Sequence, residues 1–198
     1  MRAGMGLCAV VLAAAAGASA EAISKPGQIT IAGTSTVRSW TCAVAPAVDV
    51  TMTAAGAEAL LRGERAVETV NVTVQVAEVD CNNGKMNDHL RKALKAEAHP
   101  TIRYELSTYD VTDTAEGASV SAQGELTIAG ATQPVVMAIT LVRDEDGSVR
   151  ARGEHQVVMP QFGVKPPSLM LGTMKVGEKV TITFDVPVSS QGAVQPAV

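Results

Sequence analysis

The sequence TVNVTVQV at residues 69–76 places a valine at every even position and a polar residue at every odd position. Successive side chains of a β-strand point to opposite faces, so this alternation predicts a strand with one apolar and one polar face. The apolar face of such a strand has to be buried against another part of the fold. The segment therefore predicts a half-buried sheet, and the flanking sequence should contain its partners.

The same alternation recurs on both sides of this segment and predicts about eight antiparallel strands in a mainly β fold. The expected strands are residues 29–44, 47–52, 70–76, 102–106, 120–128, 135–141, 148–159 and 180–186. Periodicity alone does not distinguish a two-sheet sandwich from a closed barrel. The distinction matters because a barrel of ~8 strands has room for side chains or for one small ligand.

Residues 85–96 break the rhythm of the strands and predict one inserted helix. Met86, Leu90 and Leu94 fall on one face at helical spacing, and the preceding Asn-Asn-Gly offers a turn and a cap. A shorter alanine-rich stretch at 54–62 is a second candidate helix. The expected fold is an eight-stranded antiparallel sheet with one inserted helix.

Residues 1–20 have the pattern of a secretory signal peptide. A positive Arg2 precedes an apolar run at 7–16, and an Ala-Ser-Ala triplet resembles a cleavage site. The run is shorter than the ~20 residues of a membrane-spanning helix, which argues against an anchor. Cys8 lies inside the run and follows a leucine, which argues against a lipoprotein. We therefore expect a periplasmic or secreted protein.

Residues 21–188 are expected to form one domain, followed by a disordered polar tail at 189–198. The full sequence has 16 Lys and Arg against 20 Asp and Glu, a net charge of −4. This acidic balance argues against nucleic acid as a partner. Beyond the leader, the sequence contains no segment apolar enough to span a membrane, so stable membrane insertion is not expected. The sequence leaves a homodimer open.

Cys42 and Cys81 are the two cysteines expected to remain after export. An even number of cysteines in an oxidising compartment predicts a disulfide. A metal site would require more ligands nearby, and a redox pair would more often be closely spaced. We therefore favour a structural disulfide over both alternatives.

The sequence contains no recognisable catalytic or cofactor-binding pattern. His89, His99 and His155 do not have the spacing of a metal site, and Asp88 beside His89 is expected on a solvated helix face. The nucleophile elbow, the phosphate-binding loop and the dinucleotide fingerprint are absent from the sequence. We therefore predict no catalytic residue, no metal and no cofactor.

Several segments, in order along the chain, resemble the YceI-like family of exported, lipocalin-like polyisoprenoid-binding proteins. They are GTSTVRSW at 33–40, MNDHL at 86–90, HPTI at 99–102, GELTIAGATQPV at 124–135 and FGV at 162–164. The chain departs from the family pattern at Arg38-Ser39, where His-Asp is common, and at Ala93-Leu94, where two phenylalanines are common. Because aromatic residues make up only 3% of the chain, these departures leave the identity of a ligand open.

The resemblance implies an eight-stranded barrel, partly closed by the helix, whose apolar interior takes a long isoprenoid chain. It does not imply an enzyme. Strand parity then proposes the residues that line the interior, and Tyr104 among them could offer its hydroxyl to a polar head or to a buried water. The proposed lining is Val70, Val72, Val74, Val76, Ile102, Tyr104, Leu106, Leu126, Ile128, Met137, Ile139 and Leu141.

Two functions follow from these patterns. The first is a binding or carrier protein that shields a polyisoprenoid or related long-chain lipid from water. The second is a ligand-free sandwich or barrel that acts on other cell-envelope proteins through its outer surface. A ligand-sized apolar cavity would favour the first, whereas a filled interior would favour the second.

Overall fold

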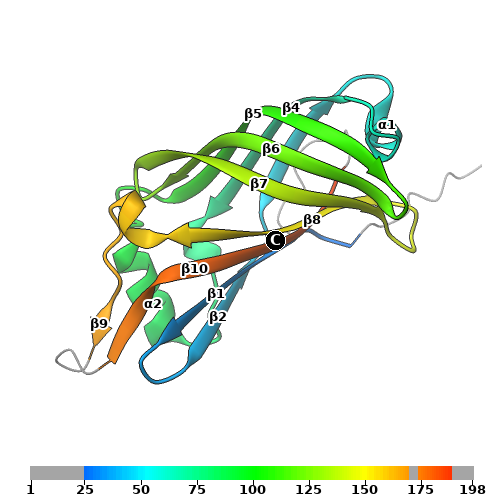
Figure 1. Cartoon of the computed structure of the whole chain (residues 1–198). Helices are drawn as coiled ribbons and strands as arrows, with labels where there is room; N and C mark the ends of the chain where they lie inside the picture. The colour runs from blue at the N-terminus through cyan, green and yellow to red at the C-terminus, as the bar shows by residue number, and fades with distance from the viewer. Residues whose placement is uncertain (1–24, 170–173, 189–198) are drawn as a thin grey trace, which may run out of the picture.

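In a computed structural model that describes residues 25–169 and 174–188, ten strands form one antiparallel sheet (Figure 1). The predicted leader at 1–20 and the predicted tail at 189–198 lie outside these residues. In the order in which they pair, the strands are β2 (Ser39–Val44), β1 (Gln28–Ser35), β10 (Met174–Pro187), β8 (Val149–Val158), β7 (Ala131–Arg143), β6 (Gly117–Ile128), β5 (Thr101–Thr114), β4 (Val67–Gln75) and β3 (Ala47–Met52). The short β9 (Ser168–Leu169) pairs with β10 alone.

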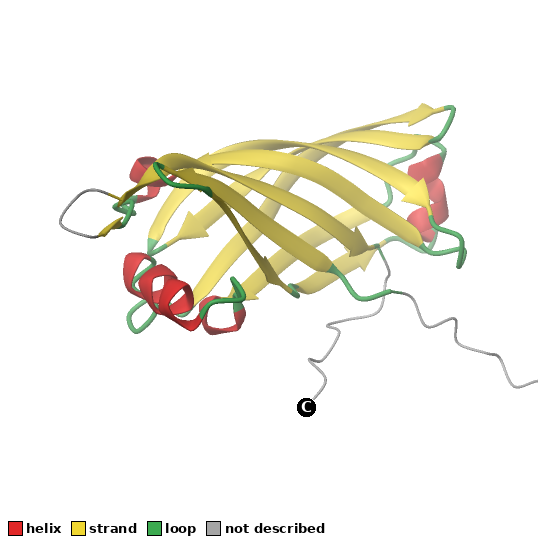
Figure 2. Cartoon of the chain, turned by 90° about the horizontal axis from the view of Figure 1, so that it is seen from below, coloured by secondary structure: helices red, strands yellow, loops and turns green. Residues whose placement is uncertain are grey.

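The sheet curls around a common interior, as in a barrel (Figure 2). Helix α1 (Gly56–Leu61) lies at one end of the curled sheet and α2 (Gly84–Ala93) at the other (Figures 1 and 2). Two short 3₁₀ helices, η1 (Val76–Glu78) and η2 (Met159–Phe162), follow β4 and β8. The predicted mainly β, barrel-like class is confirmed, and one continuous sheet replaces the sandwich alternative.

The predicted single strand at 29–44 is wrong, because the chain reverses within it and forms the hairpin β1–β2. Ser35 makes the turn: its hydroxyl donates to the Arg38 carbonyl at 2.8 Å and accepts from the Arg38 amide at 3.1 Å. Gly33 pairs with Trp40, and the indole lies so close that a side chain on Gly33 would collide with it. This reversal is one reason why the strand count exceeds the predicted eight.

Helix α2 confirms the predicted inserted helix, but it ends at Ala93 instead of residue 96. The Asn83 side chain caps its start by accepting from the Met86 amide at 3.1 Å. Lys95 takes a positive φ of 54° just beyond the helix, which breaks the helical repeat. The alanine-rich candidate is also helical, so the described chain has two α-helices where the predicted fold had one.

Strands β2 and β3 are the two edges of the sheet, and no ladder joins them among the described residues. The segment after η1, which continues from β4, lies against β2 and covers part of this gap. Ala43 in β2 exchanges two backbone hydrogen bonds with Asp80, at 2.8 and 2.9 Å. The neighbouring Cys42 and Cys81 form a disulfide, as predicted, and both are buried. The gap is thus bridged by one covalent bond and one pair of hydrogen bonds.

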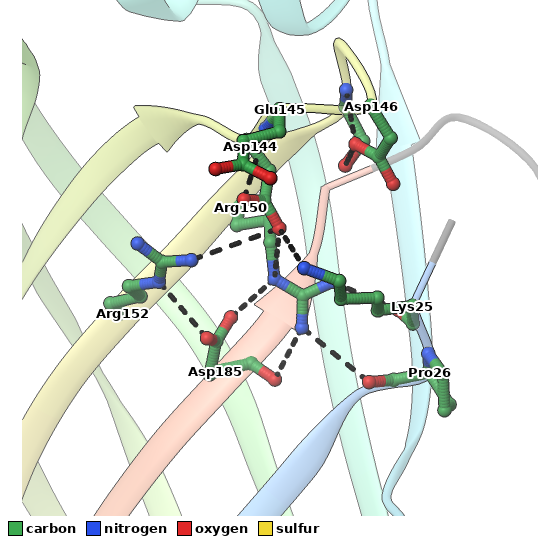
Figure 3. Close-up of polar contacts among 9 residues, drawn as sticks. Lys25, Pro26, Asp144, Glu145, Asp146, Arg150, Arg152 and Asp185 are labelled. Atoms are coloured by element: carbon green, nitrogen blue, oxygen red, sulfur yellow. Dashed lines mark hydrogen bonds and ion pairs between the residues drawn. The ribbon is translucent and has the colours of Figure 1, made fainter. Parts of the chain in front are cut away.

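The buried Arg150 on β8 connects this strand to β10 and to the segment before β1 (Figure 3). The Arg150 guanidinium donates to the Asp185 carboxylate on β10 and to the backbone carbonyl of Lys25 at 2.9 Å. Arg152 also donates to Asp185, at 2.9 Å. Partial burial alone would raise the pKa of Asp185, but the hydrogen bonds from the two arginines outweigh it and hold the pKa below its usual range. Asp185 therefore links β8 to β10 as a carboxylate.

We predict that replacing Cys42 and Cys81 together by alanine destabilises the protein strongly. Closing a loop between residues separated by 39 positions corresponds to about 4 kcal/mol in the chain-entropy description. Urea unfolding should show this loss, and a reductant should lower the midpoint of the wild type without affecting the variant. Two reactive thiols in the denatured, unreduced wild type would contradict the prediction.

We also predict that Asp185→Asn costs about 1–2 kcal/mol at pH 7, because Arg150 loses the nearer of its two carboxylate partners and the lost carboxylate is partly exposed to solvent. The pKa of Asp185 is lower in the folded state, so its contribution is complete above the ordinary aspartate pKa and is lost as the pH falls through the folded-state pKa. The stability difference between wild type and variant should therefore shrink in acid. Asp49→Asn on the exposed face of β3 is the control and should change stability little at either pH.

Candidate ligand-binding interior

The inward face of the sheet consists mostly of apolar residues that alternate with polar ones along the strands. Along β6, Val120, Ala122, Leu126 and Ile128 are buried, and the residues between them are mostly exposed. The neighbouring β7 continues the same face, because Ala122 pairs with Met137. The parity seen in the sequence therefore places the apolar side chains inside the curl of the sheet.

These side chains do not fill the interior completely. A cavity of about 190 Å³, here called the inner cavity, lies between β3–β7 on one side and β1, β8 and β10 on the other. Ten of the twelve residues proposed from parity line it: Val70, Val72, Val74, Ile102, Tyr104, Leu106, Leu126, Met137, Ile139 and Leu141. Ile128 lines a second cavity instead, whereas Val76 lies in η1 and lines neither.

The second cavity, here called the outer cavity, has a volume of about 340 Å³ and lies beneath α2. Met86, Leu90 and Leu94 line it, as expected for the apolar face of that helix. Ala93 lines it too, and this residue and Leu94 stand where phenylalanines are common in the resembling sequences. The smaller side chains leave more open space at this end than two aromatic rings would.

The rim of the outer cavity is polar, unlike its floor. Ser35 and Arg38 from the β1–β2 turn and Asn83, Lys85 and His89 from the start of α2 line the rim. Arg38 and Lys85 are exposed, so the interior reaches solvent at this end.

The inner and outer cavities meet at three isoleucine side chains. Ile31, Ile102 and Ile182 line both spaces, and all three are only partly buried. Exposed pockets for drug-sized ligands run to ~300–1,000 Å³, and the outer cavity alone falls within this range. The two adjacent cavities therefore lie within one largely apolar interior, the outer cavity beneath α2.

Sequence reasoning missed the share of the lining that comes from β1, β3 and β10. Ile29, Val50, Phe184 and Val186 line the inner cavity and obey the same period of two. Extending the parity argument to these strands would have found them. His155 is harder to find, because it is a polar residue at an inward position of β8, opposite Ile182. Burial lowers the pKa of this histidine, which therefore lies in the cavity as a neutral imidazole at pH 7.

Two tyrosines also line the inner cavity, and their buried hydroxyls differ in hydrogen bonding. The Tyr109 hydroxyl accepts from the amides of Ala66 and Val67, at 2.9 Å each. The Tyr104 hydroxyl is buried and has no hydrogen-bond partner among the described residues. Burial raises the pKa of Tyr104 to about 12, so this hydroxyl stays protonated.

The lining of the inner cavity is apolar apart from His155 and the two tyrosines. Within residues 25–169 and 174–188, His, Cys, Asp and Glu form no group of three or more that could hold a metal ion. Over the same residues, none of the helices is long and apolar enough to cross a membrane. What the arrangement can do is hold an apolar molecule away from water.

Fold and interior together define a class of protein: a curled antiparallel β-sheet built around an apolar cavity, with a helix beside its opening. A family model for the YceI-like domain matches residues 29–188. The chain belongs to this family, which confirms the resemblance found in the sequence.

Comparisons with individual proteins agree with this assignment. The YceI protein of Escherichia coli O157:H7 is 30% identical over 106 residues, covering 50% of this chain and 54% of that protein. The chain thus spans about half the length of the curated relatives it matches. BcnA of Burkholderia cenocepacia shares the fold with a TM-score of 0.62 at 18% identity, over 80% of this chain and 94% of that one. A polyisoprenoid binding domain from Saccharophagus degradans, implicated in plant cell wall breakdown, gives 0.59 at 8% identity, over 83% and 94%.

We predict that Leu90→Ala costs about 2 kcal/mol, near the lower end of the range for leucine truncation, because Leu90 is only half-buried. Lys92→Ala, on the exposed face of the same helix, should change stability little. Denaturant unfolding of both variants checks this. Equal midpoints would mean that the apolar face of α2 does not support the fold.

Proposed function

We propose that this protein binds and carries a long apolar lipid, with a polyisoprenoid as the favoured class, and that it catalyses no reaction. The proposal is supported by the apolar interior of the curled sheet, in which the inner and outer cavities lie next to each other. An extended hydrocarbon chain would fit here with one end in the inner cavity and the other end in the outer cavity near α2.

The driving force for such binding is the removal of hydrocarbon from water. Each Å² of apolar surface buried contributes about 25 cal/mol, which the inward valines, isoleucines and leucines can supply without a directional contact. The cavity also exists before the ligand arrives, so little of this energy is spent on rearranging the sheet. Binding through such a surface is strong and not very selective.

The choice of an isoprenoid rests on the family. The Saccharophagus degradans neighbour is described as a polyisoprenoid binding domain, and this chain shares its fold. Aliphatic, methyl-branched side chains dominate the lining here, and a methyl-branched chain packs against them as well as a straight one does.

The proposed place of action is the periplasm or the exterior of the cell. The leader-like residues 1–20 support export, and the buried Cys42–Cys81 disulfide is of the kind that persists in an oxidising compartment. A carrier there would move a lipid between membranes through water, because the lipid alone is insoluble in water.

The first experiment is an organic extract of the purified protein, read by mass spectrometry. We expect a long-chain lipid, with prenyl species prominent, at a substantial fraction of the protein concentration. If the extract contains no lipid and the wild type binds no fluorescent apolar probe, the lipid-binding proposal fails. The alternative, a ligand-free protein that acts on other cell-envelope proteins through its outer surface, then becomes the better one.

The second experiment introduces one polar side chain into the inner cavity and, as a control, the same side chain on the outer face of the sheet. Met137 faces the inner cavity, whereas its neighbour Val136 is 60% exposed on the outer face of β7. We predict that Met137→Gln lowers the affinity for a prenyl chain about tenfold, because the amide must be buried without a partner or keep water in the cavity. Val136→Gln should bind like the wild type. Circular dichroism should show both variants folded, and equal affinities would remove Met137 from the site.

A further inference from the structure

The rim of the outer cavity carries two cationic side chains that the fold does not use. Arg38, from the β1–β2 turn, and Lys85, from the first turn of α2, both line this cavity and are exposed. Among the described residues, neither the Arg38 guanidinium nor the Lys85 ammonium forms an ion pair or a hydrogen bond. The arginines near the other end of the sheet differ, because Arg143 pairs with Glu58 and Arg150 is also paired with carboxylates. The two charges at the rim are therefore available to a ligand.

No carboxylate balances these cations in the lining of the interior. Among the described residues that line the inner and outer cavities, none is Asp or Glu, although the whole chain has a net charge of −4. The acidic residues near the start of α2 have other partners: Asp88 pairs with Arg91, and Asp80 accepts from the Asn87 side chain at 2.9 Å. A cationic rim on an acidic molecule is a local feature, and such a feature attracts an anion to one place.

The N-terminus of α2 lies at the same rim and adds to its positive character. Asn83, which caps the helix, lines the outer cavity, as do Lys85 and His89 one turn apart. The first turn of α2 contains no acidic side chain. The amide groups at the start of a helix carry a partial positive charge, which favours an anion near them. The helix therefore reinforces the charge of the two side chains.

Both sides of the rim are held in place by the fold. The Ser35 hydroxyl fixes the β1–β2 turn by hydrogen bonds to the carbonyl and the amide of Arg38. The Cys42–Cys81 disulfide then joins β2, the second strand of this hairpin, to the segment that leads into α2. The backbones that carry Arg38 and Lys85 are thus positioned before a ligand arrives, which lowers the cost of binding.

Resting on the proposed lipid-binding function, we propose that Arg38 and Lys85 bind the phosphate of a polyprenyl phosphate, whose prenyl chain occupies the apolar interior. A phosphate monoester carries a charge of about −1.5 to −2 at pH 7, which two cations balance. The planar guanidinium offers paired N–H donors that match phosphate oxygens, and the ammonium adds a point charge. Because both side chains are exposed, the phosphate keeps part of its hydration and no charge has to be buried.

The test compares geranylgeranyl phosphate with geranylgeraniol, the neutral alcohol of the same chain. Displacement of a fluorescent apolar probe gives both affinities for the wild type, for Arg38→Gln/Lys85→Gln and for the control Lys92→Gln/Lys95→Gln, which removes two exposed charges that line neither cavity. We expect the wild type to prefer the phosphate by about tenfold. The rim variant should lose this preference while its affinity for the alcohol stays the same, and the control should keep it.

Two further measurements locate the phosphate. The ³¹P resonance of bound geranylgeranyl phosphate should differ between the wild type and the rim variant, and it should be unchanged in the control. The preference of the wild type for the phosphate should shrink as the salt concentration rises, because the rim is exposed. Since Arg38 and Lys85 make no contact that stabilises the fold, the rim variant should unfold at the same urea concentration as the wild type.

Inorganic phosphate distinguishes a lipid headgroup from a free anion. Titrated into the ligand-free wild type, it should bind far more weakly than geranylgeranyl phosphate, because it lacks the prenyl chain. If inorganic phosphate binds as tightly as the lipid and the rim variant abolishes this binding, the rim is a site for the free anion and the proposed headgroup contact is wrong.

The remaining outcomes separate the contact from the function on which it rests. If the wild type binds the phosphate and the alcohol equally, if the rim variant keeps the preference, or if the control loses it as well, the contact is wrong while lipid binding stands. If the wild type binds neither compound, the proposed lipid-binding function fails and the contact fails with it.

Discussion

The gap between the edge strands β2 and β3 is the constraint on which the interior depends. A curled sheet encloses a dry space only if its edges are paired or covered, because an open edge admits water to the apolar face. Here the edges do not form a ladder with each other. The segment after η1 reaches across instead, with the Ala43–Asp80 hydrogen bonds and the Cys42–Cys81 disulfide side by side. The same segment leads directly into α2, so the element that closes the gap also positions the helix beside the opening.

The shape of the interior follows from where small residues stand among large ones. The small residues Ala122 and Ala151 line the inner cavity, whereas the space beside Gly124 is taken by the ring of Tyr104. The aliphatic walls are adaptable, whereas the polar groups are few and fixed. A site of this kind would obtain its affinity from the walls and its selectivity from the rare polar groups.

Much of this was predictable from alternation, because the period of two is a local property. The alternation in β4, β6 and β7 indicates which face is buried, and the leader-like pattern at 1–20 together with two cysteines was enough to predict the disulfide. The turn at Ser35, the end of α2 and the inward placement of His155 were not predictable in this way. The turn depends on the packing of Trp40 against Gly33 within the hairpin, and the surroundings of His155 depend on the register of β8 with Ile182 on β10. The missing partner of the Tyr104 hydroxyl is likewise a property of the assembled interior.

The position of β10 has a consequence for how the chain acquires its structure. β10 is the most C-terminal described strand, yet it lies between β1, the most N-terminal, and β8. The β1–β2 hairpin therefore cannot join the rest of the sheet until β10 is available. Contacts between segments so far apart in sequence are formed late and slowly, since a long loop must close before they are rewarded. We expect the nascent chain to remain without its complete sheet until β10 has been synthesised, so the proposed export would begin with a chain whose sheet is still incomplete.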